Sequence, residues 1–247
     1  MNTYSHDAVV PFKDSGESKK RQVEAMFDKI AFRYDFLNRF LSAGTDIRWR
    51  KKAIKMLVPD RPKKILDVAT GTGDFAITCY NILKPELITG IDLSEGMLEI
   101  GRKKIENLGL SNQILLLKGD GEAIFFGDNS FDAVTVAFGV RNFGNLEKGL
   151  SEIRRVLKPG GKLIILEFSK PSLPVFKNLY NLYMRFVTPK VGKLISKNKD
   201  AYQYLNDSVQ QFPEKKTFIQ ILNKTGYRNS FYKTLSLGIC TIYCSEK

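Results

Sequence analysis

The chain has 247 residues, 43% of them hydrophobic, which is enough to build one α/β domain with extra helices. Its formal net charge is +13, from 39 Lys and Arg against 26 Asp and Glu. Such an excess favours an anionic partner: a nucleic acid, an anionic membrane surface or a phosphate-bearing ligand. The single histidine, His6, argues against Ser-His triads, histidine acid–base catalysis and histidine-ligated zinc.

The three cysteines are too few for a disulfide framework and lack the spacing of a metal knuckle, so we expect buried thiols and no metal site. No apolar run reaches eighteen residues, and residues 1–20 lack the apolar core of a signal peptide. We therefore expect a cytoplasmic protein. The sequence leaves open whether it also associates peripherally with a membrane.

Residues 1–60 are predicted to form a flexible arm followed by a helical extension. The arm covers residues 1–19, which are mostly polar. Apolar residues then recur at helical spacing over residues 23–41, with an interruption or bend expected near Arg33–Asp35. A second helix is expected over Ile47–Leu57, where two prolines follow.

Residues 61–247 are predicted to form one domain in which short apolar strands alternate with helices. This pattern is typical of an α/β, Rossmann-like fold: a doubly wound, mostly parallel seven-stranded sheet that binds ligands at the carboxyl ends of its strands. The last two strands are separated by a short connection and should form an antiparallel hairpin at the sheet edge. A helical, substrate-side insertion is expected at about 172–225. The predicted strands are Ile65–Ala69, Leu87–Ile91, Ile114–Leu117, Phe131–Ala137, Leu163–Phe168, Tyr227–Lys233 and Ser236–Cys244.

The first predicted strand runs into a helix through a glycine turn, Asp67-Val-Ala-Thr-Gly71-Thr-Gly73-Asp74. Gly71 and Gly73 allow the backbone to approach a ligand, and the following helix offers free N–H groups to it. Asp92 ends the second strand about twenty residues later, where a carboxylate accepts hydrogen bonds from the hydroxyls of an adenosine ribose. The turn and the distal acid predict a site for an adenosine-containing cofactor.

Spacing alone does not separate a dinucleotide from S-adenosylmethionine, because the turn also satisfies the G-x-G-x-x-A pattern. Asp74 places a carboxylate where a pyrophosphate would bind, which disfavours a dinucleotide and is tolerable for a ligand that carries a sulfonium and an amino group. Asp120 follows the third strand and is placed to accept a hydrogen bond from an adenine amino group, although a turn aspartate is an ordinary finding. Together these acids favour the methyl donor.

Three further stretches carry a resemblance to a known family: Met26–Ala31 continuing to Asn38, Phe138–Asn142, and Arg155–Gly161 continuing to Pro171. With the glycine turn, they resemble the ubiquinone/menaquinone biosynthesis C-methyltransferase family, within the class I methyltransferases that use S-adenosylmethionine. The resemblance covers most of the chain from about residue 20, and the proline-glycine turn in it is the least specific part. Thr70 stands where some relatives have glycine.

The resemblance implies a set of contacts to the cofactor. Ala137 stands where some relatives carry serine, so only its backbone is available there, and Met97 is either an adenine contact or a core methionine. The residues expected to bind the cofactor are Asp67, Gly71, Thr72, Gly73, Asp92, Met97, Asp120, Gly121 and Ala137.

The family's reaction methylates a ring carbon of a polyprenylated hydroquinone, and a phenol with a pKa near 10 must first become electron-rich. Arg141 is our candidate to stabilise the phenolate, because it follows the fourth strand and keeps its charge; the alternative is a surface ion pair. Asn142 is expected to orient the ring or a water molecule. Tyr34 and Asp35 are expected to cover the site, although a helix-face tyrosine is often a core residue.

Residues 170–199 contain seven Lys or Arg and no Asp or Glu, with aromatic residues at helical spacing. We expect an amphipathic helix over Ser172–Val187 that either admits the prenyl tail from an anionic membrane surface or packs its apolar face on the sheet. The expected partners are therefore a polyprenylated quinol and a membrane surface, without nucleic acid. The sequence leaves open whether the protein forms a homo-oligomer, whether the substrate ring is a naphthoquinone or a benzoquinone, and how long its prenyl tail is.

Two other functions fit parts of the sequence. An RNA methyltransferase would use the same fold and suit the basic charge, but the chain lacks a recognisable RNA-binding motif. An NAD-dependent oxidoreductase would use the same glycine turn, but Asp74 disfavours it. RNA binding that weakens with salt would favour the first alternative, and nicotinamide binding would favour the second.

Overall fold

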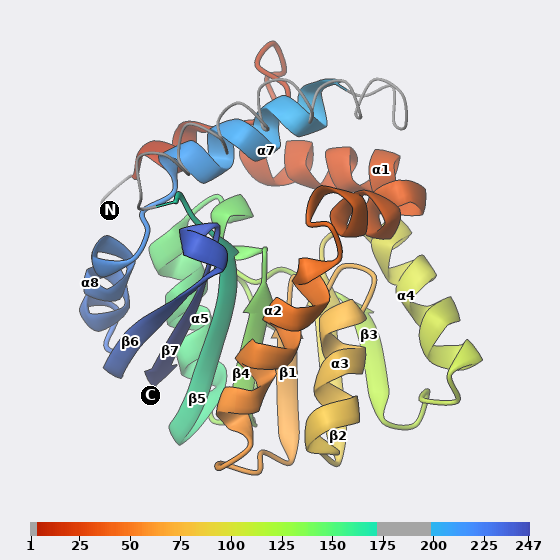
Figure 1. Cartoon of the computed structure of the whole chain (residues 1–247), viewed down its shortest axis with the longest axis vertical. Helices are drawn as coiled ribbons and strands as arrows, with labels where there is room; N and C mark the ends of the chain where they lie inside the picture. Colours follow the sequence, from red (N-terminus) through yellow and green to blue (C-terminus); the bar gives the residue numbers. More distant parts are fainter. Residues whose placement is uncertain (1–3, 172–198) are drawn as a thin grey trace.

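A computed structural model describes residues 4–171 and 199–247 (Figure 1). Seven strands form one sheet in the order β3-β2-β1-β4-β5-β7-β6. The first five strands are parallel, and β7 pairs antiparallel with both β5 and β6. The predicted doubly wound sheet with an antiparallel C-terminal hairpin is thus confirmed. The strands are β1 Lys64–Val68, β2 Leu87–Asp92, β3 Ile114–Lys118, β4 Phe131–Ala137, β5 Leu157–Phe168, β6 Arg228–Leu235 and β7 Cys240–Glu246.

Helices cover both faces of the sheet, and each face has its own apolar core. One core lies between the sheet and α2 (Thr45–Ile54), α3 (Asp74–Leu83) and α4 (Glu95–Asn107). The other lies between the sheet and α5 (Leu146–Val156) and α8 (Lys216–Lys224). The central strands are apolar toward both faces, as expected of a parallel sheet covered on two sides.

Two helices lie over the carboxyl edge of the sheet (Figure 1). They are α1 (Lys19–Leu41) and α7 (Lys199–Gln211), which pack against each other through Met26 and Tyr204. Because ligands bind at this edge in doubly wound sheets, α1 and α7 are placed to form the roof of a site.

Several predicted boundaries are wrong. The last strand begins at Cys240 rather than Ser236, because Ser236–Gly238 form a 3₁₀ turn. The helix α1 is continuous through Arg33–Asp35, where the sequence predicts an interruption. Asp35 in this stretch accepts a hydrogen bond from Thr72 of the glycine turn and pairs with Lys104 of α4. The strand β5 begins at Leu157 rather than Leu163. Its Pro-Gly-Gly turn is accommodated as an irregularity in the pairing with β4, between the Leu157 and Lys162 positions.

The segment predicted to be a flexible arm makes specific contacts from Tyr4 onward. A short 3₁₀ turn at Ser5–Ala8 buries His6, whose exposed fraction is 0%. The buried ammonium of Lys19 donates to the carbonyl of His6 at 2.7 Å. The His6 ring packs edge-on against Phe212, and its nitrogens make no hydrogen bond with the described residues. The start of this segment, around Ser5 and His6, is therefore packed against the end of α7.

Burial of His6 predicts a pH-dependent stability. Burial lowers the pKa of His6 from 6.5 to about 3, so between these values the unfolded chain binds a proton that the folded chain rejects. The free energy of unfolding should then fall as the pH falls below 6.5, by about 1.4 kcal/mol per pH unit from this residue. Urea denaturation of the wild type and His6→Leu at pH 7 and pH 5 measures it, and we expect the wild type to lose about 2 kcal/mol more than the variant. Equal losses in the two proteins would contradict the assignment.

No helix among residues 4–171 and 199–247 is long and apolar enough to span a bilayer. In the same residues, no group of three or more His, Cys, Asp or Glu side chains is arranged to hold a metal ion.

Candidate active site

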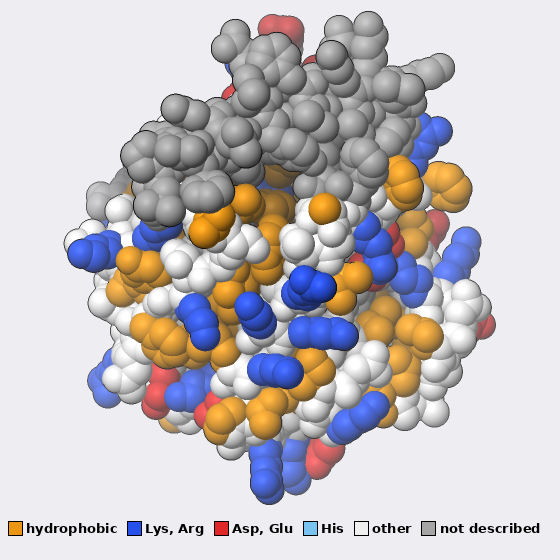
Figure 2. Space-filling model, viewed as in Figure 1, with side chains coloured by type: hydrophobic (Ala, Val, Ile, Leu, Met, Phe, Trp, Pro, Cys, Tyr) orange, Lys and Arg blue, Asp and Glu red, His pale blue; other side chains and the backbone are white. Residues whose placement is uncertain are grey.

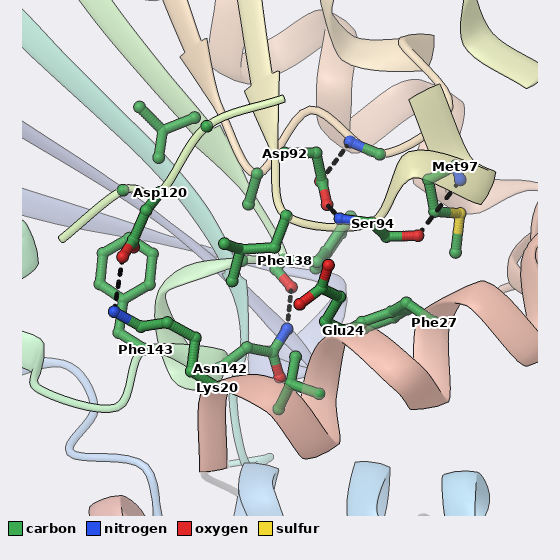
Figure 3. A pocket seen from close by; sticks show the side chains of 18 of the residues that line it. Lys20, Glu24, Phe27, Asp92, Ser94, Met97, Asp120, Phe138, Asn142 and Phe143 are labelled. Carbon is green, nitrogen blue, oxygen red and sulfur yellow. Dashed lines mark hydrogen bonds and ion pairs between the residues drawn. The ribbon is translucent and has the colours of Figure 1, made fainter. Parts of the chain in front are cut away.

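A pocket with about 700 Å³ of empty space, partly open to solvent, lies at the carboxyl ends of β1, β2 and β4 under α1 (Figure 3). The glycine turn after β1 and the loops after β2 and β3 form its floor, and Lys20, Glu24 and Phe27 reach it from α1. The pocket is thus covered by a helix from the N-terminal extension, where the sequence places Tyr34 and Asp35.

Asp92 lies at the end of β2 on the floor of this pocket (Figure 3). One carboxylate oxygen accepts from the backbone N–H of Gly71 at 2.8 Å, and the other accepts from that of Ser94 at 2.9 Å. Burial raises the pKa of Asp92, against these two backbone donors. The carboxylate therefore joins the glycine turn to the next helix and leaves lone pairs for a ligand.

Asp120 and Gly121 form the opposite wall of the pocket. The Asp120 carboxylate pairs with Lys20 of α1 at 2.6 Å, so a ligand there meets an ion pair rather than an isolated acid. A Cβ on Gly121 would lie 2.8 Å from Val68 and 3.1 Å from the Phe143 ring. Only glycine allows this close approach, which keeps the wall open at the predicted adenine position.

The other predicted cofactor residues fall into two groups. Gly71, Met97 and Ala137 line the pocket. Asp67, Thr72 and Gly73 lie outside its lining: Asp67 is buried and accepts from Thr70 and Thr135, each at 2.6 Å, and Gly73 caps α3 in a left-handed conformation. In this structure these three residues shape the turn, and a direct contact to the cofactor stays a prediction for them.

Asp74 is neutralised by cations that sequence spacing did not reveal. Its carboxylate lies 2.7 Å from Lys104 and 3.5 Å from Arg39. Burial acts to raise the pKa of Asp74, but the Lys104 ammonium outweighs it and the pKa is lowered. The acid stays charged and paired, so its repulsion of a pyrophosphate is weaker than the sequence suggests.

A second pocket, with about 570 Å³ of empty space, lies between α1, α7 and the end of β5. Its walls are mostly apolar and include Met26, Ile30 and Leu205. Phe27 and Tyr34 line both this pocket and the first. The two pockets therefore adjoin each other, as a cofactor and a second substrate require.

Arg141 is the cation of the second pocket. Its side chain is buried, with 4% of the residue exposed, and its Nη1 lies 2.7 Å from the Glu167 carboxylate. Burial acts to lower the pKa of Arg141, but Glu167 outweighs it and raises the pKa, so the guanidinium stays charged. Its Nε has no hydrogen-bond partner among the described residues. A buried, charged donor without a partner is a binding group for an anionic oxygen.

An aromatic stack supports Arg141. The rings of Phe138 and Phe168 stack with centroids 4.4 Å apart. The Arg141 guanidinium lies over the Phe168 ring at 5.4 Å, and the buried Arg50 lies over the Phe138 ring at 5.5 Å. Phe138 also accepts a hydrogen bond from Arg141 through its carbonyl, and its φ is +59°. A bulky residue in this conformation is strained, which is common where a site depends on backbone placement.

Asn142, Tyr34 and Asp35 take different positions around the two pockets. Asn142 lines the first pocket, and its Oδ1 accepts from the Tyr204 hydroxyl at 3.0 Å. Tyr34 lies at the junction of the pockets, and burial raises the pKa of its hydroxyl. Asp35 lines neither: it accepts from Thr72 at 2.6 Å and pairs with Lys104 at 2.6 Å. Asp35 thus fastens α1 to the glycine turn, and a catalytic role for these three residues stays a prediction.

Glu167 and Tyr204 are among the residues of the site that the sequence analysis does not predict. Glu167, the partner of Arg141, stands in the apolar run of β5, and a carboxylate in a buried strand is a signal that can be recognised. Tyr204, which contacts Asn142, carried no such signal, because a tyrosine on an amphipathic helix is usually a core residue.

Replacing Asp35 with asparagine distinguishes a structural role, in which the carboxylate holds α1 to the glycine turn, from a catalytic role. If the carboxylate holds α1 over the pocket, Asp35→Asn weakens the bond to Lys104 and should raise the Kd of S-adenosylmethionine about fivefold, with kcat changed less. Calorimetric titration and initial rates measure the two quantities. A large loss of kcat at unchanged Kd would instead make Asp35 a catalytic group. Asp14→Asn, at an exposed position, is the control.

Comparison with known proteins agrees with this geometry. The family model described as the ubiE/COQ5 methyltransferase family matches residues 15–247. A demethylmenaquinone methyltransferase from Bacteroides fragilis is 46% identical over 244 residues, covering 99% of each chain. A ubiquinone/menaquinone biosynthesis C-methyltransferase UbiE from Geobacter sulfurreducens is 44% identical over 230 residues, covering 93% of this chain and 90% of the relative.

Among solved structures, a SAM-dependent methyltransferase from Thermotoga maritima superposes with a TM-score of 0.62 at 20% identity, covering 90% of this chain and 99% of the other. At that identity the likeness establishes the shared fold. With the family match and the adjoining pockets, the protein is an enzyme that uses S-adenosyl-L-methionine, and it belongs to the ubiE/COQ5 methyltransferase family.

Proposed function

We propose that this enzyme methylates a ring carbon of a polyprenylated hydroquinone in quinone biosynthesis, converting demethylmenaquinol to menaquinol or acting on the equivalent ubiquinone precursor. The observation that carries the proposal is the apolar second pocket, which adjoins the cofactor pocket and contains the buried cation Arg141. The names of the two relatives support the same substrate class. The RNA and dinucleotide alternatives gain no support from these matches.

The first pocket fits an adenosine-containing cofactor. Asp92 is placed to accept from ribose hydroxyls, and the close approach of Gly121 to Val68 leaves a slot for the adenine. When bound there, S-adenosylmethionine supplies an electrophilic methyl group on its sulfonium. Phe27 and Tyr34, at the junction of the pockets, exclude water from the space between the two ligands.

Arg141 is proposed to hold the ring oxygen of the substrate as a phenolate. Its free Nε–H is the donor, while Glu167 and the Phe168 ring keep the guanidinium in one orientation. A fixed cation in a buried site favours the phenolate over the phenol, which raises the electron density at the ortho carbon. The ring proton is then lost to water, and Asn142, held by Tyr204, is proposed to orient the ring or that water.

The prenyl tail needs an apolar route from a membrane to the second pocket. Ser172–Val187, expected to provide this route, lies outside the described residues. We propose peripheral contact with an anionic membrane surface from the cytoplasmic side, since the substrate is a lipid and the chain carries a net charge of +13. Self-association is a separate proposal, for which light scattering is the test.

A radiolabelled methyl-transfer assay with a prenylated demethyl-quinol in detergent tests the function, after titration with S-adenosylmethionine and with NADH. We expect S-adenosylmethionine to bind and the label to enter the quinol. Cofactor binding with label entering RNA instead would replace the proposed substrate. Binding of NADH without S-adenosylmethionine would overturn the assignment of the enzyme class.

A further inference from the structure

The outer face of α2 and the 3₁₀ turn that follows it (Lys55–Leu57) carries a stripe of basic residues. Arg48, Lys51, Lys52 and Lys55 recur at spacings of three and four, so they share one face of the helix, and all are exposed. None of them makes an ion pair or hydrogen bond with the described residues. Figure 2 shows Lys and Arg side chains gathered on the surface over α2. We call these four residues the α2 basic stripe.

The stripe is not needed to hold α2 in place. The opposite face of the helix is buried through Trp49, Ala53 and Ile54, which belong to one of the two cores. The only acidic residue between positions 42 and 58 is Asp46, which is buried. Four like charges without counterions repel one another, which costs stability unless a ligand of opposite charge binds them.

Apolar side chains flank the stripe. Val58 follows it at the same spacing and is 47% exposed. Leu237 is 55% exposed and lies in the turn Ser236–Gly238, which is joined to α2 by a hydrogen bond of 2.8 Å from Trp49 to Ser236. The φ of Leu237 is +58°, a conformation that costs free energy for a leucine. The exposure of this leucine side chain is unfavourable in water and becomes favourable at an apolar surface.

We propose that the α2 basic stripe, with Val58 and Leu237, docks on the surface of an anionic lipid bilayer. Cationic side chains beside exposed apolar ones are the composition of an interfacial membrane contact. The choice of lipid over other anionic partners rests on the proposed quinol substrate. RNA is less suited, because the stripe lies on one convex helix without an exposed aromatic side chain to stack on bases.

This position brings the membrane close to the reaction site. Trp49, on the buried face of α2, lies 6.5 Å from the Phe138 ring and 6.4 Å from the Phe168 ring, measured between centroids. Phe138 lines the first pocket and Phe168 lines the second. One helix, with a diameter of about 10 Å, therefore separates the docked surface from the aromatic wall of both pockets.

Vesicle sedimentation of the full chain tests the proposal, with phosphatidylcholine vesicles compared with vesicles that are one-third phosphatidylglycerol. We expect the wild type to bind the anionic vesicles and Lys51→Glu/Lys52→Glu/Lys55→Glu to bind them about 100-fold more weakly. The matched control Lys103→Glu/Lys216→Glu/Lys233→Glu changes the net charge equally, at exposed positions without an ion pair to the described residues, and it should lose less than about fivefold. Equal losses in the two triple variants would overturn the proposal.

A second variant tests the apolar contact. Leu237→Asn introduces a residue that tolerates positive φ, so folding is preserved, and we expect about tenfold weaker binding to the anionic vesicles. Unchanged binding would remove Leu237 from the docking surface. Loss of RNA binding by the stripe variant, with vesicle binding intact, would replace the lipid by a nucleic acid.

Activity on two substrates separates this inference from the proposed function. The stripe variant should methylate a short-chain, water-soluble quinol at the wild-type rate and should lose at least about tenfold in rate on a long-chain quinol embedded in vesicles. Equal rates on the embedded quinol would contradict the docking surface. A wild type that binds anionic vesicles but methylates neither quinol would contradict the proposed function alone.

Discussion

Replacing Arg141 with lysine should lower kcat for ring methylation by about 100- to 1000-fold, the usual effect of losing an oriented donor to a developing oxyanion. Lysine keeps a positive charge near Glu167, so the buried carboxylate retains a partner. It cannot reproduce the Nε–H that has no partner among the described residues, or the planar contact with Phe168. Initial rates at saturating S-adenosylmethionine, over a range of quinol concentrations, measure the effect.

The control for this experiment is Arg155→Lys, because Arg155 also forms ion pairs but does so with Glu152 and Asp128 at the surface. It should leave kcat within about twofold of the wild type. The Kd of S-adenosylmethionine should stay the same in both variants. If Arg141→Lys keeps wild-type kcat, Arg141 is a structural partner of Glu167 and phenolate formation needs another group. Arg141→Met is less informative, because an unpaired buried Glu167 would cost about 3–5 kcal/mol of stability.

Replacing Asp92 with asparagine should raise the Kd of S-adenosylmethionine about 100-fold, because charged hydrogen bonds to the ribose hydroxyls become neutral ones. The amide retains one acceptor for the backbone N–H groups of Gly71 and Ser94. Isothermal titration measures the Kd, and a thermal melt checks that the glycine turn remains folded. Asp60→Asn, an exposed change, is the control. A Kd within about threefold of the wild type would exclude Asp92 as the ribose ligand.

The same carboxylate predicts a pH dependence of cofactor binding. Burial raises the pKa of Asp92 above its ordinary value. As the pH falls through that raised pKa, the carboxylate is protonated and loses its acceptor strength toward the ribose. The affinity of the wild type should therefore weaken at a higher pH than an exposed aspartate would allow, and Asp92→Asn should lack this dependence.

The elements of the fold were largely predictable from the sequence, because their signals are local. Apolar runs bounded by turn residues gave β4 at its observed bounds, Phe131–Ala137, and the other parallel strands except β5 to within a residue or so. The start of β5 was not predictable, because a Pro-Gly-Gly segment is a turn signal whether or not strand pairing continues across it. The continuity of α1 depended on contacts with distant loops, which override local helix preference.

The features of the site also divide into those that the sequence predicts and those that depend on the folded structure. Sequence by itself determined the glycine turn, Asp92 and the position of Arg141 after β4, since spacing along a doubly wound sheet brings strand ends to one edge. Only the tertiary structure decided that Arg141 is buried against Glu167 and that Asp74 is neutralised by Lys104. These features are pairings between residues far apart in the chain, and a side chain's charge state and exposure depend on the neighbours that folding brings to it.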